Sequence, residues 1–225
     1  MLRKILFPLL LGLAGCAVLI GLGLWQVERL AWKEAILAEV DSRLAADPVA
    51  LTTDVTEAAD EYARVTLTGT VTGQELHVLD SGTQAGTGYR VIAKLDTGIG
   101  PVMADLGLLP LADKEMAPLT GEVTVVGTLL WPDDRNDSTP APDLARNIWF
   151  ARDVPAMAEA LGTQELLVVA STMSPADPRL TPLPVTAAGI KNDHLEYAIT
   201  WFLLAIVWAV MTLYLIRRTL RPNKD

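Results

Sequence analysis

The sequence contains little cysteine and histidine. Cys16 is the one cysteine among 225 residues, and the two histidines, His77 and His194, lie far apart in the chain. A single cysteine excludes an intramolecular disulfide and a cluster of thiolates. Copper carriage would need Cys, Met or His gathered in the central region, where His77 is the only histidine. The fold must therefore be held together by its apolar core.

Common catalytic and nucleotide-binding signatures are also absent from the sequence. It has no GxSxG, no HExxH, no P-loop and no CxxCH for covalent haem. Gly21 and Gly23 form a Gly-x-Gly pair, but this pair lies inside an apolar run instead of opening a strand–helix turn. We therefore expect a protein that is not an enzyme.

Basic side chains are scarce relative to acidic ones. The chain has 18 Lys and Arg against 27 Asp and Glu, and residues 26–193 alone hold 12 against 25, a net charge of −13. Nucleic-acid binding requires a basic face. The acidic balance thus excludes nucleic acid as an expected partner.

Two long runs without charge account for a mean hydropathy of +0.32. Residues 5–25 and 197–216 contain no charged side chain, over 21 and 20 residues. As helices they would be about 30 Å long, enough to cross a bilayer. The sequence predicts transmembrane helices at 5–25 and 195–216, of which the first continues as a helix to about residue 46. Its continuation rests on apolar residues at helical spacing, namely Leu30, Ile36, Leu37, Val40 and Leu44.

Cys16 allows two interpretations of the first run. The stretch Leu13-Ala14-Gly15-Cys16, preceded by basic and apolar residues, has the form of a bacterial lipoprotein cleavage site. Lipoproteins usually continue with a polar tether after this cysteine, whereas this chain stays apolar as far as Trp25. We therefore predict a lasting helix, with lipidation of Cys16 as the alternative.

Basic residues flank the outer ends of both runs, which predicts the orientation of the protein. Arg3 and Lys4 precede the first run, and the tail 217–225 carries Arg217, Arg218, Arg221 and Lys224. The positive-inside rule then places both termini in the cytoplasm and residues 47–190 on the other side of the membrane. That side is the periplasm if the membrane is a bacterial inner membrane and the intermembrane space if the protein is mitochondrial.

The central region, 47–190, has the period-two pattern of strands. Alternating apolar residues predict six of them, separated by Gly, Ser, Thr and Asp, at 63–71, 75–80, 89–95, 101–106, 122–129 and 165–170. One helix follows Asp153, which can cap it, and ends at Gly162. The predicted fold is an α+β membrane protein, in which two transmembrane helices flank a β-rich, antiparallel, partial-barrel-like extracytoplasmic domain with few helices.

His194 stands at the start of the second apolar run. On a helix it shares one face with Tyr197, Ala198, Trp201, Ala205 and Trp208. These residues could simply suit the membrane interface, where Tyr and Trp are enriched and a histidine can hydrogen-bond to water. Alternatively, a neutral imidazole at His194 could bind haem iron, with the aromatic and small residues forming a slot for the macrocycle.

Two motifs carry a resemblance to a known family. Residues 23–33 read GLWQVERLAWK and residues 192–202 read NDHLEYAITWF. They resemble the GxWQxxRxxWK and NxHxxYAxTWF signatures of the Surfeit/Shy family of cytochrome c oxidase assembly factors. Further landmarks similar to the family follow in order at 62–65 with Gly69, at 88–91 and at 147–153.

The resemblance implies a bacterial, membrane-anchored assembly factor for the oxidase that contains haem a. Such a protein would bind haem a transiently and assist its insertion into subunit I. The implied partners are subunit I with its assembly intermediates, haem A synthase and membrane lipid. A scaffold that holds oxidase subunits without binding a cofactor is the alternative.

The resemblance also assigns residues. His194 corresponds to the family's haem-ligand histidine, and helix geometry adds Tyr197 and Trp201 as pocket neighbours. Arg29 follows the first predicted span, where its guanidinium could pair with haem propionates if the two helices pack at the level of His194. The remaining signature residues are expected at the interface with lipid or a partner, namely Trp25, Gln26, Trp32 and Lys33.

One stretch departs from the family pattern. The family usually shows Arg-Gly-Trp-Val-Pro after its central strands, where this chain has Leu106-Gly107-Leu108-Leu109-Pro110. Leu106 and Leu108 thus replace the arginine and the tryptophan. If this stretch is a loop that docks a partner or haem propionates, we expect the protein either to dock them differently or to serve a variant oxidase.

Overall fold

The computed structural model describes residues 2–83, 85–189 and 191–221, and it divides into two compact units. The helical unit comprises Met1–Glu39 and Ala187–Asp225, and the barrel domain comprises Val40–Thr186. Two helices are long and apolar enough to cross a membrane, in the ranges Ile5–Ala45 and His194–Leu220. The predicted architecture of a β-rich domain between two apolar helices is confirmed.

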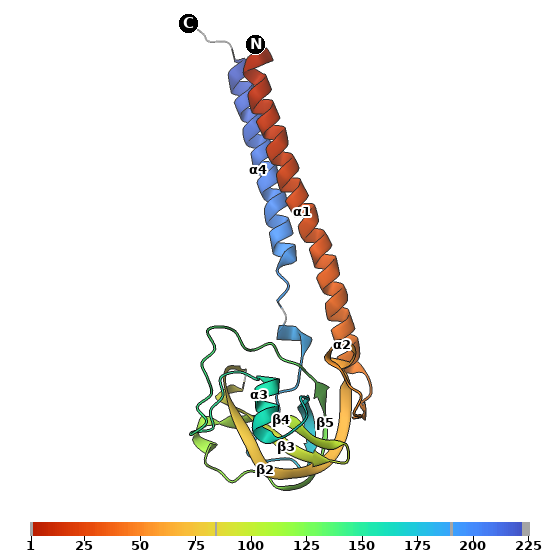
Figure 1. Cartoon of the computed structure of the whole chain (residues 1–225). Coiled ribbons are helices and arrows are strands. Elements are labelled where there is room, and N and C mark those ends of the chain that lie inside the picture. Colours follow the sequence, from red (N-terminus) through yellow and green to blue (C-terminus); the bar gives the residue numbers. More distant parts are fainter. Residues whose placement is uncertain (1, 84, 190, 222–225) are drawn as a thin grey trace. The chain divides into compact units, whose positions relative to one another are not determined.

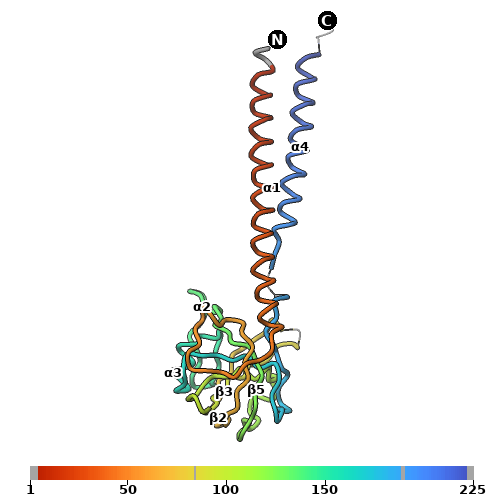
Figure 2. The backbone as a smooth tube through the Cα atoms, turned by 90° about the vertical axis from the view of Figure 1, so that its right-hand side faces the viewer, coloured from red at the N-terminus to blue at the C-terminus, as the bar shows by residue number. Residues whose placement is uncertain are grey.

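The helical unit consists mainly of two long helices that lie side by side and antiparallel (Figures 1 and 2). They are α1 (Leu2–Ala45) and α4 (His194–Leu220), and the short 3-10 helix η2 (Ala187–Gly189) precedes α4. In lipid every backbone polar group must find a partner inside the segment, so that such apolar runs form helices. Arg217 and Arg218 occupy the last turn of α4, where they complement the helix dipole. Lys224 of the predicted basic tail lies outside the described residues.

The barrel domain contains six strands and little helix (Figure 1). The C-terminal end of α1, from Val40, belongs to it, and Arg43 there donates to the carbonyl oxygens of Ala59 and Glu61 at 2.9 and 3.0 Å. The strands are β1 (Val49–Ala50), β2 (Arg64–Thr83), β3 (Gly86–Thr97), β4 (Gly100–Pro110), β5 (Gly121–Leu129) and β6 (Leu167–Ser174). The short helices are α2 (Glu57–Asp60), η1 (Leu111–Asp113) and α3 (Val154–Leu161).

Five of these strands close into a ring. The pairing order is β2-β3-β4-β6-β5, and β5 pairs back onto β2. β4 and β6 are parallel, and the chain between them passes through β5 and α3. The short β1 is parallel to β2. The sequence predicted antiparallel strands, and these two parallel pairs correct that expectation: the sheet is mixed. The predicted partial barrel is a closed barrel.

β2 makes the closure possible because it is long and bent. Its first half pairs with β5 and its second half with β3, with a register shift between Val71 and Glu75. Gly73 lies within this shift at φ +82°, a conformation that favours glycine. The predicted strands 63–71 and 75–80 are therefore two halves of one strand. Gly69 lies where both pairings overlap, and a Cβ there would be 2.8 Å from the Asp96 carbonyl oxygen.

Apolar side chains pack in two main layers. One fills the ring, with Val65, Leu95 and Val168 among its fully buried members. The other lies between the sheet and α3, where Met103 and Leu167 of the strands meet Met157 of the helix. The predicted ends of α3 are confirmed by the structure: the Asp153 side chain accepts a hydrogen bond from the Ala156 amide, and Gly162 takes the left-handed conformation.

Candidate functional site

Glycines allow α1 and α4 to approach each other closely. A Cβ added to Gly12 would lie 2.1 Å from a Thr212 side-chain atom, and one added to Gly15 would lie 2.2 Å from Trp208. A Cβ added to Gly23 would lie 2.6 Å from a Phe202 side-chain atom. The contacts follow one antiparallel register along both helices. Side chains of α4 therefore occupy the space that the glycines of α1 leave free.

Filling this space is expected to separate the helices. Gly23→Leu should weaken the pairing by about 1–3 kcal/mol, because its side chain would overlap with Phe202. The matched control is Gly21→Leu, since no atom of the described residues lies within 4 Å of a Cβ at Gly21. The Cys16 thiol reports on the pairing, because its Sγ donates to the Ala205 carbonyl oxygen of α4 at 3.8 Å.

The measurement is the rate of Cys16 alkylation by a maleimide in detergent micelles. Gly23→Leu should raise this rate several-fold above that of the unmutated protein, and Gly21→Leu should leave it unchanged. Equal rates in the two variants would contradict the packing of Gly23 on Phe202.

The same register brings Gln26 against His194. The Oε1 atom of Gln26 lies 2.7 Å from the Nδ1 atom of His194, across 168 residues of sequence. Gln26 is only 8% exposed, although it follows a membrane run whose side chains are mostly exposed. Ala198, one turn further along α4, is buried as well. Of the residues expected at the lipid or partner interface, Gln26 is thus the one that the structure joins to His194.

The aromatic residues of the two motifs near His194 differ in how much of their surface is exposed. Trp201 is half-buried, whereas Tyr197 and Trp25 expose 55% and 51% of their surface. Ala198 and Ala205 are the residues of the predicted face that are buried. The helix face therefore presents Ala198, Ala205 and Trp208 to α1, while the ring of Tyr197, one turn after His194, stays exposed.

Arg29 lies one helical turn beyond Gln26 on α1. Its guanidinium carbon stands 4.1 Å from the centre of the Trp32 ring, a cation–π contact. Both side chains are exposed, and Lys33 next to them is half-buried. Among the described residues its contact is with Trp32 and not with His194, and its N–H groups are available for an anion.

The donor set around His194 suits a haem iron better than a bare metal ion. Within residues 2–83, 85–189 and 191–221 no group of three or more His, Cys, Asp or Glu could hold an ion. A haem would bring its own nitrogen ligands, so that one imidazole, that of His194, would be enough to hold it. The buried Oδ1 atom of Asn192, two residues before His194, has no hydrogen-bond partner among the described residues. This oxygen is an unused acceptor in the segment that leads into α4.

The stretch 106–110 is part of a strand, which corrects its interpretation as a loop. Leu106 and Leu108 belong to β4 and are each 3% exposed. Leu106 lines a cavity of about 260 Å³ together with Leu180. The Leu108 amide donates to the Thr181 carbonyl oxygen at 2.8 Å. The leucines that replace the family's arginine and tryptophan therefore pack inside the domain beneath the segment 176–182.

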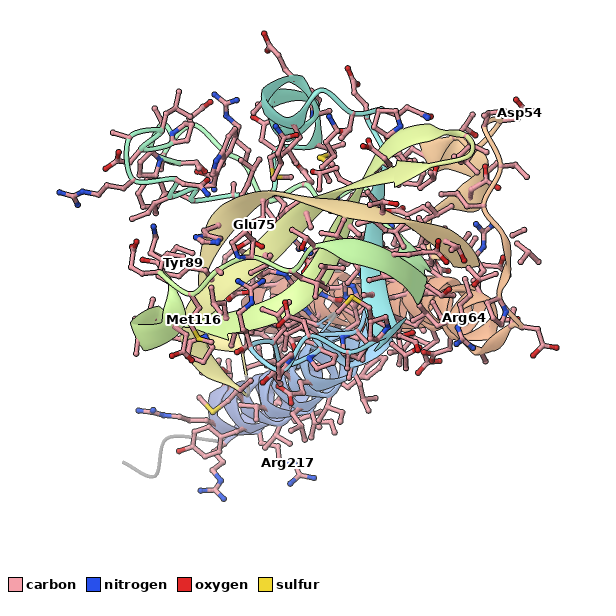
Figure 3. All side chains as sticks on the ribbon, turned by 90° about the horizontal axis from the view of Figure 1, so that it is seen from below. Asp54, Arg64, Glu75, Tyr89, Met116 and Arg217 are labelled. Atoms are coloured by element: carbon pink, nitrogen blue, oxygen red, sulfur yellow. The ribbon has the colours of Figure 1, made fainter. Side chains whose placement is uncertain are left out.

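His77 belongs to a buried polar cluster that the sequence pattern did not indicate. Its Nε2 atom lies 2.9 Å from Glu75 Oε1, and Arg179 contacts both Glu75 and Asp177 at 3.3 and 2.8 Å. The ring of Tyr89 lies 5.6 Å from that of His77, and Figure 3 shows Tyr89 and Glu75 on the same side of the barrel domain. The cluster ties the segment after β6 to β2.

This cluster also sets the ionisation of Glu75. Burial alone would raise the pKa of this carboxyl, but hydrogen bonds and charges from His77 and Arg179 outweigh burial and hold the pKa below its usual value. A carboxyl with a lowered pKa in the folded state stabilises the fold above its unfolded pKa. This contribution is lost as the pH falls through the folded pKa.

Comparison with known proteins places the chain among the Surfeit proteins. The model of the SURF1 family matches residues 13–206. Surfeit locus protein 1 of Homo sapiens is 30% identical, over 81% of this chain and 68% of that protein. The protein of the same name from Rattus norvegicus is 29% identical, over 83% and 68%, and that from Xenopus tropicalis is 28% identical, over 80% and 66%. The chain thus spans about two thirds of the length of these relatives.

Proposed function

Because the chain belongs to the SURF1 family, we propose that it is an assembly factor for cytochrome c oxidase that binds haem a at His194. It holds the haem transiently and assists its insertion into subunit I. The oxidase role follows from the family that the motifs resemble, and the haem role is supported by the site. The observation that carries the proposal is the His194 imidazole held by Gln26, one helical turn before the exposed ring of Tyr197.

Each residue of the site has a distinct part in this function. If haem a is bound, its iron would supply the site for an imidazole nitrogen of the protein. His194 offers that ligand from the first turn of α4. Tyr197 and Trp201 provide flat apolar surface for the macrocycle edge, and Arg29 supplies a cation for its propionates. No chemical step is assigned to the protein, which acts as an accessory factor and not as an enzyme.

The membrane setting completes the proposal. The helices α1 and α4 span a bacterial inner membrane with both termini in the cytoplasm, and the barrel domain is periplasmic. His194 then lies at the periplasmic surface of the bilayer. There the protein receives haem a from haem A synthase. At the same surface it meets subunit I in its assembly intermediates.

The test is the absorption spectrum of the protein purified from cells that make haem A. The unmutated protein should show a Soret band, and His194→Ala should lose it because the axial ligand is gone. His77→Gln is the matched control, since it removes the other histidine of the chain, and it should keep the band. An unmutated protein without a Soret band would replace the haem role with that of a cofactor-free scaffold.

A further inference from the structure

The hydrogen bond between Gln26 and His194 determines which imidazole nitrogen is free. The Gln26 atom in contact is Oε1, a carbonyl oxygen that can only accept a hydrogen bond. With Gln26 Oε1 as the acceptor, the His194 Nδ1 atom is the donor and carries the proton. A neutral imidazole has one N–H group, which leaves the lone pair on Nε2.

The surroundings of this bond keep it in place. Gln26 is buried, so that water competes little for its Oε1 atom. Gly23, one turn earlier on α1, is packed against Phe202, and Ala198 is buried one turn after His194. Both neighbouring turns are thus locked in register. Among the described residues the Nε2 atom of His194 has no hydrogen-bond partner, which leaves its lone pair open.

We propose that Gln26 is a positioning residue that holds His194 as the Nδ1–H tautomer, with Nε2 directed to bind iron. This inference rests on the proposed function and extends it by one residue. Histidines that bind metals usually donate their second N–H group to a fixed acceptor, which sets the orientation of the ring and strengthens the ligand. Here that acceptor comes from the other membrane helix, so pairing of α1 with α4 prepares the ligand.

The first arm of the test needs no haem. The full chain is labelled with ¹⁵N-histidine in detergent micelles, and its two histidines are assigned with His194→Ala. The unmutated protein should show His194 as the Nδ1–H tautomer. Gln26→Leu should convert it to the Nε2–H tautomer or a mixture, whereas Gln26→Glu keeps an acceptor of the same length and should preserve the Nδ1–H form. Glu28→Gln, on the exposed side of the same turn, is the control and should change nothing.

The second arm measures titration with haem a. Gln26→Leu should weaken binding by about 10–100-fold and lower the iron–histidine stretching frequency in the resonance Raman spectrum. Gln26→Glu should restore both. Unchanged Cys16 alkylation in Gln26→Leu shows that the helices remain paired, which separates positioning of the imidazole from a structural role.

The outcomes distinguish the two proposals. If His194→Ala loses haem a while Gln26→Leu binds it with unchanged affinity and tautomer, the role of Gln26 is overturned and the proposed function stands. If the unmutated protein binds no haem a, the proposed function fails, and the role of Gln26 toward iron fails with it. Persistence of the Nδ1–H form in Gln26→Leu also overturns the inference.

Discussion

Replacement of Arg179 by methionine is expected to destabilise the barrel domain by about 3–5 kcal/mol, because two buried carboxylates lose their cation. The side chains of Arg179, Asp177 and Glu75 are 5%, 2% and 9% exposed. Water therefore cannot replace the missing guanidinium. Since domains of this size are stable by about 5–15 kcal/mol, the loss is a large share of the total. Urea unfolding of the full chain in detergent micelles measures it.

Acid unfolding of Arg179→Met is a second measurement of the same prediction. Arg179 is one of the groups that hold the pKa of Glu75 below its usual value. Without Arg179 this pKa rises, so the stabilising contribution of the Glu75 carboxylate is lost at a higher pH. The midpoint of acid unfolding should therefore move upward in Arg179→Met.

Arg146→Met is the control for this prediction. Arg146 also pairs with a carboxylate, Asp143 at 3.6 Å, but its side chain is 77% exposed. An exposed pair contributes about 0–1 kcal/mol, so this variant should unfold almost like the unmutated protein. Similar losses of stability in the two variants would show that the buried ion pairs stabilise the domain no more than the exposed pair does.

Gly107→Ala should destabilise the barrel domain by about 2–6 kcal/mol, through two effects that add. Gly107 has φ +128°, a conformation that costs a residue with a Cβ about 1–3 kcal/mol. The new Cβ would also lie 2.5 Å from the Thr181 carbonyl oxygen, and relieving such a contact costs about 1–3 kcal/mol. The pairing of Leu108 with Thr181 should open as a consequence, which hydrogen exchange of the Leu108 amide detects.

Two further glycines separate these effects. Gly121 has φ +113°, and in the part of the chain that the structure describes no atom lies within 4 Å of an added Cβ, so Gly121→Ala isolates the backbone strain. Gly98 has neither feature, so Gly98→Ala should stay within about 0.5 kcal/mol of the unmutated protein. The expected order of stability is Gly98→Ala, then Gly121→Ala, then Gly107→Ala. A Gly107→Ala protein as stable as Gly121→Ala would mean that β4 and Thr181 are not tightly packed.

Features that depend on neighbouring residues could be predicted from the sequence. The charge-free runs predict the two long helices because a bilayer admits few other structures. Asp153 and Gly162 mark the ends of α3 because capping involves groups within one turn. Apolar alternation predicts most strands, but it could not show that Gly73 continues β2 as a bulge instead of ending a strand.

Contacts between distant residues could not be predicted in this way. Glu75 and Arg179 are 104 residues apart, and their types alone suggest two solvated surface charges. Leu106 and Leu108 looked like changes in a docking loop, and only the closed ring shows that they are buried. Burial depends on strand pairing across the whole domain, which no local pattern records.

The sequence by itself determined the two long apolar helices, the β-rich centre and the position of His194 at the start of the second helix, because hydropathy and spacing are local properties. The tertiary structure decided the closure of the barrel and the partner of His194. The glycines of α1 set the register of the helix pair, and this register brings Gln26 to within 2.7 Å of the imidazole. That hydrogen bond forms only when the two helices pack, because its donor and acceptor belong to opposite ends of the chain.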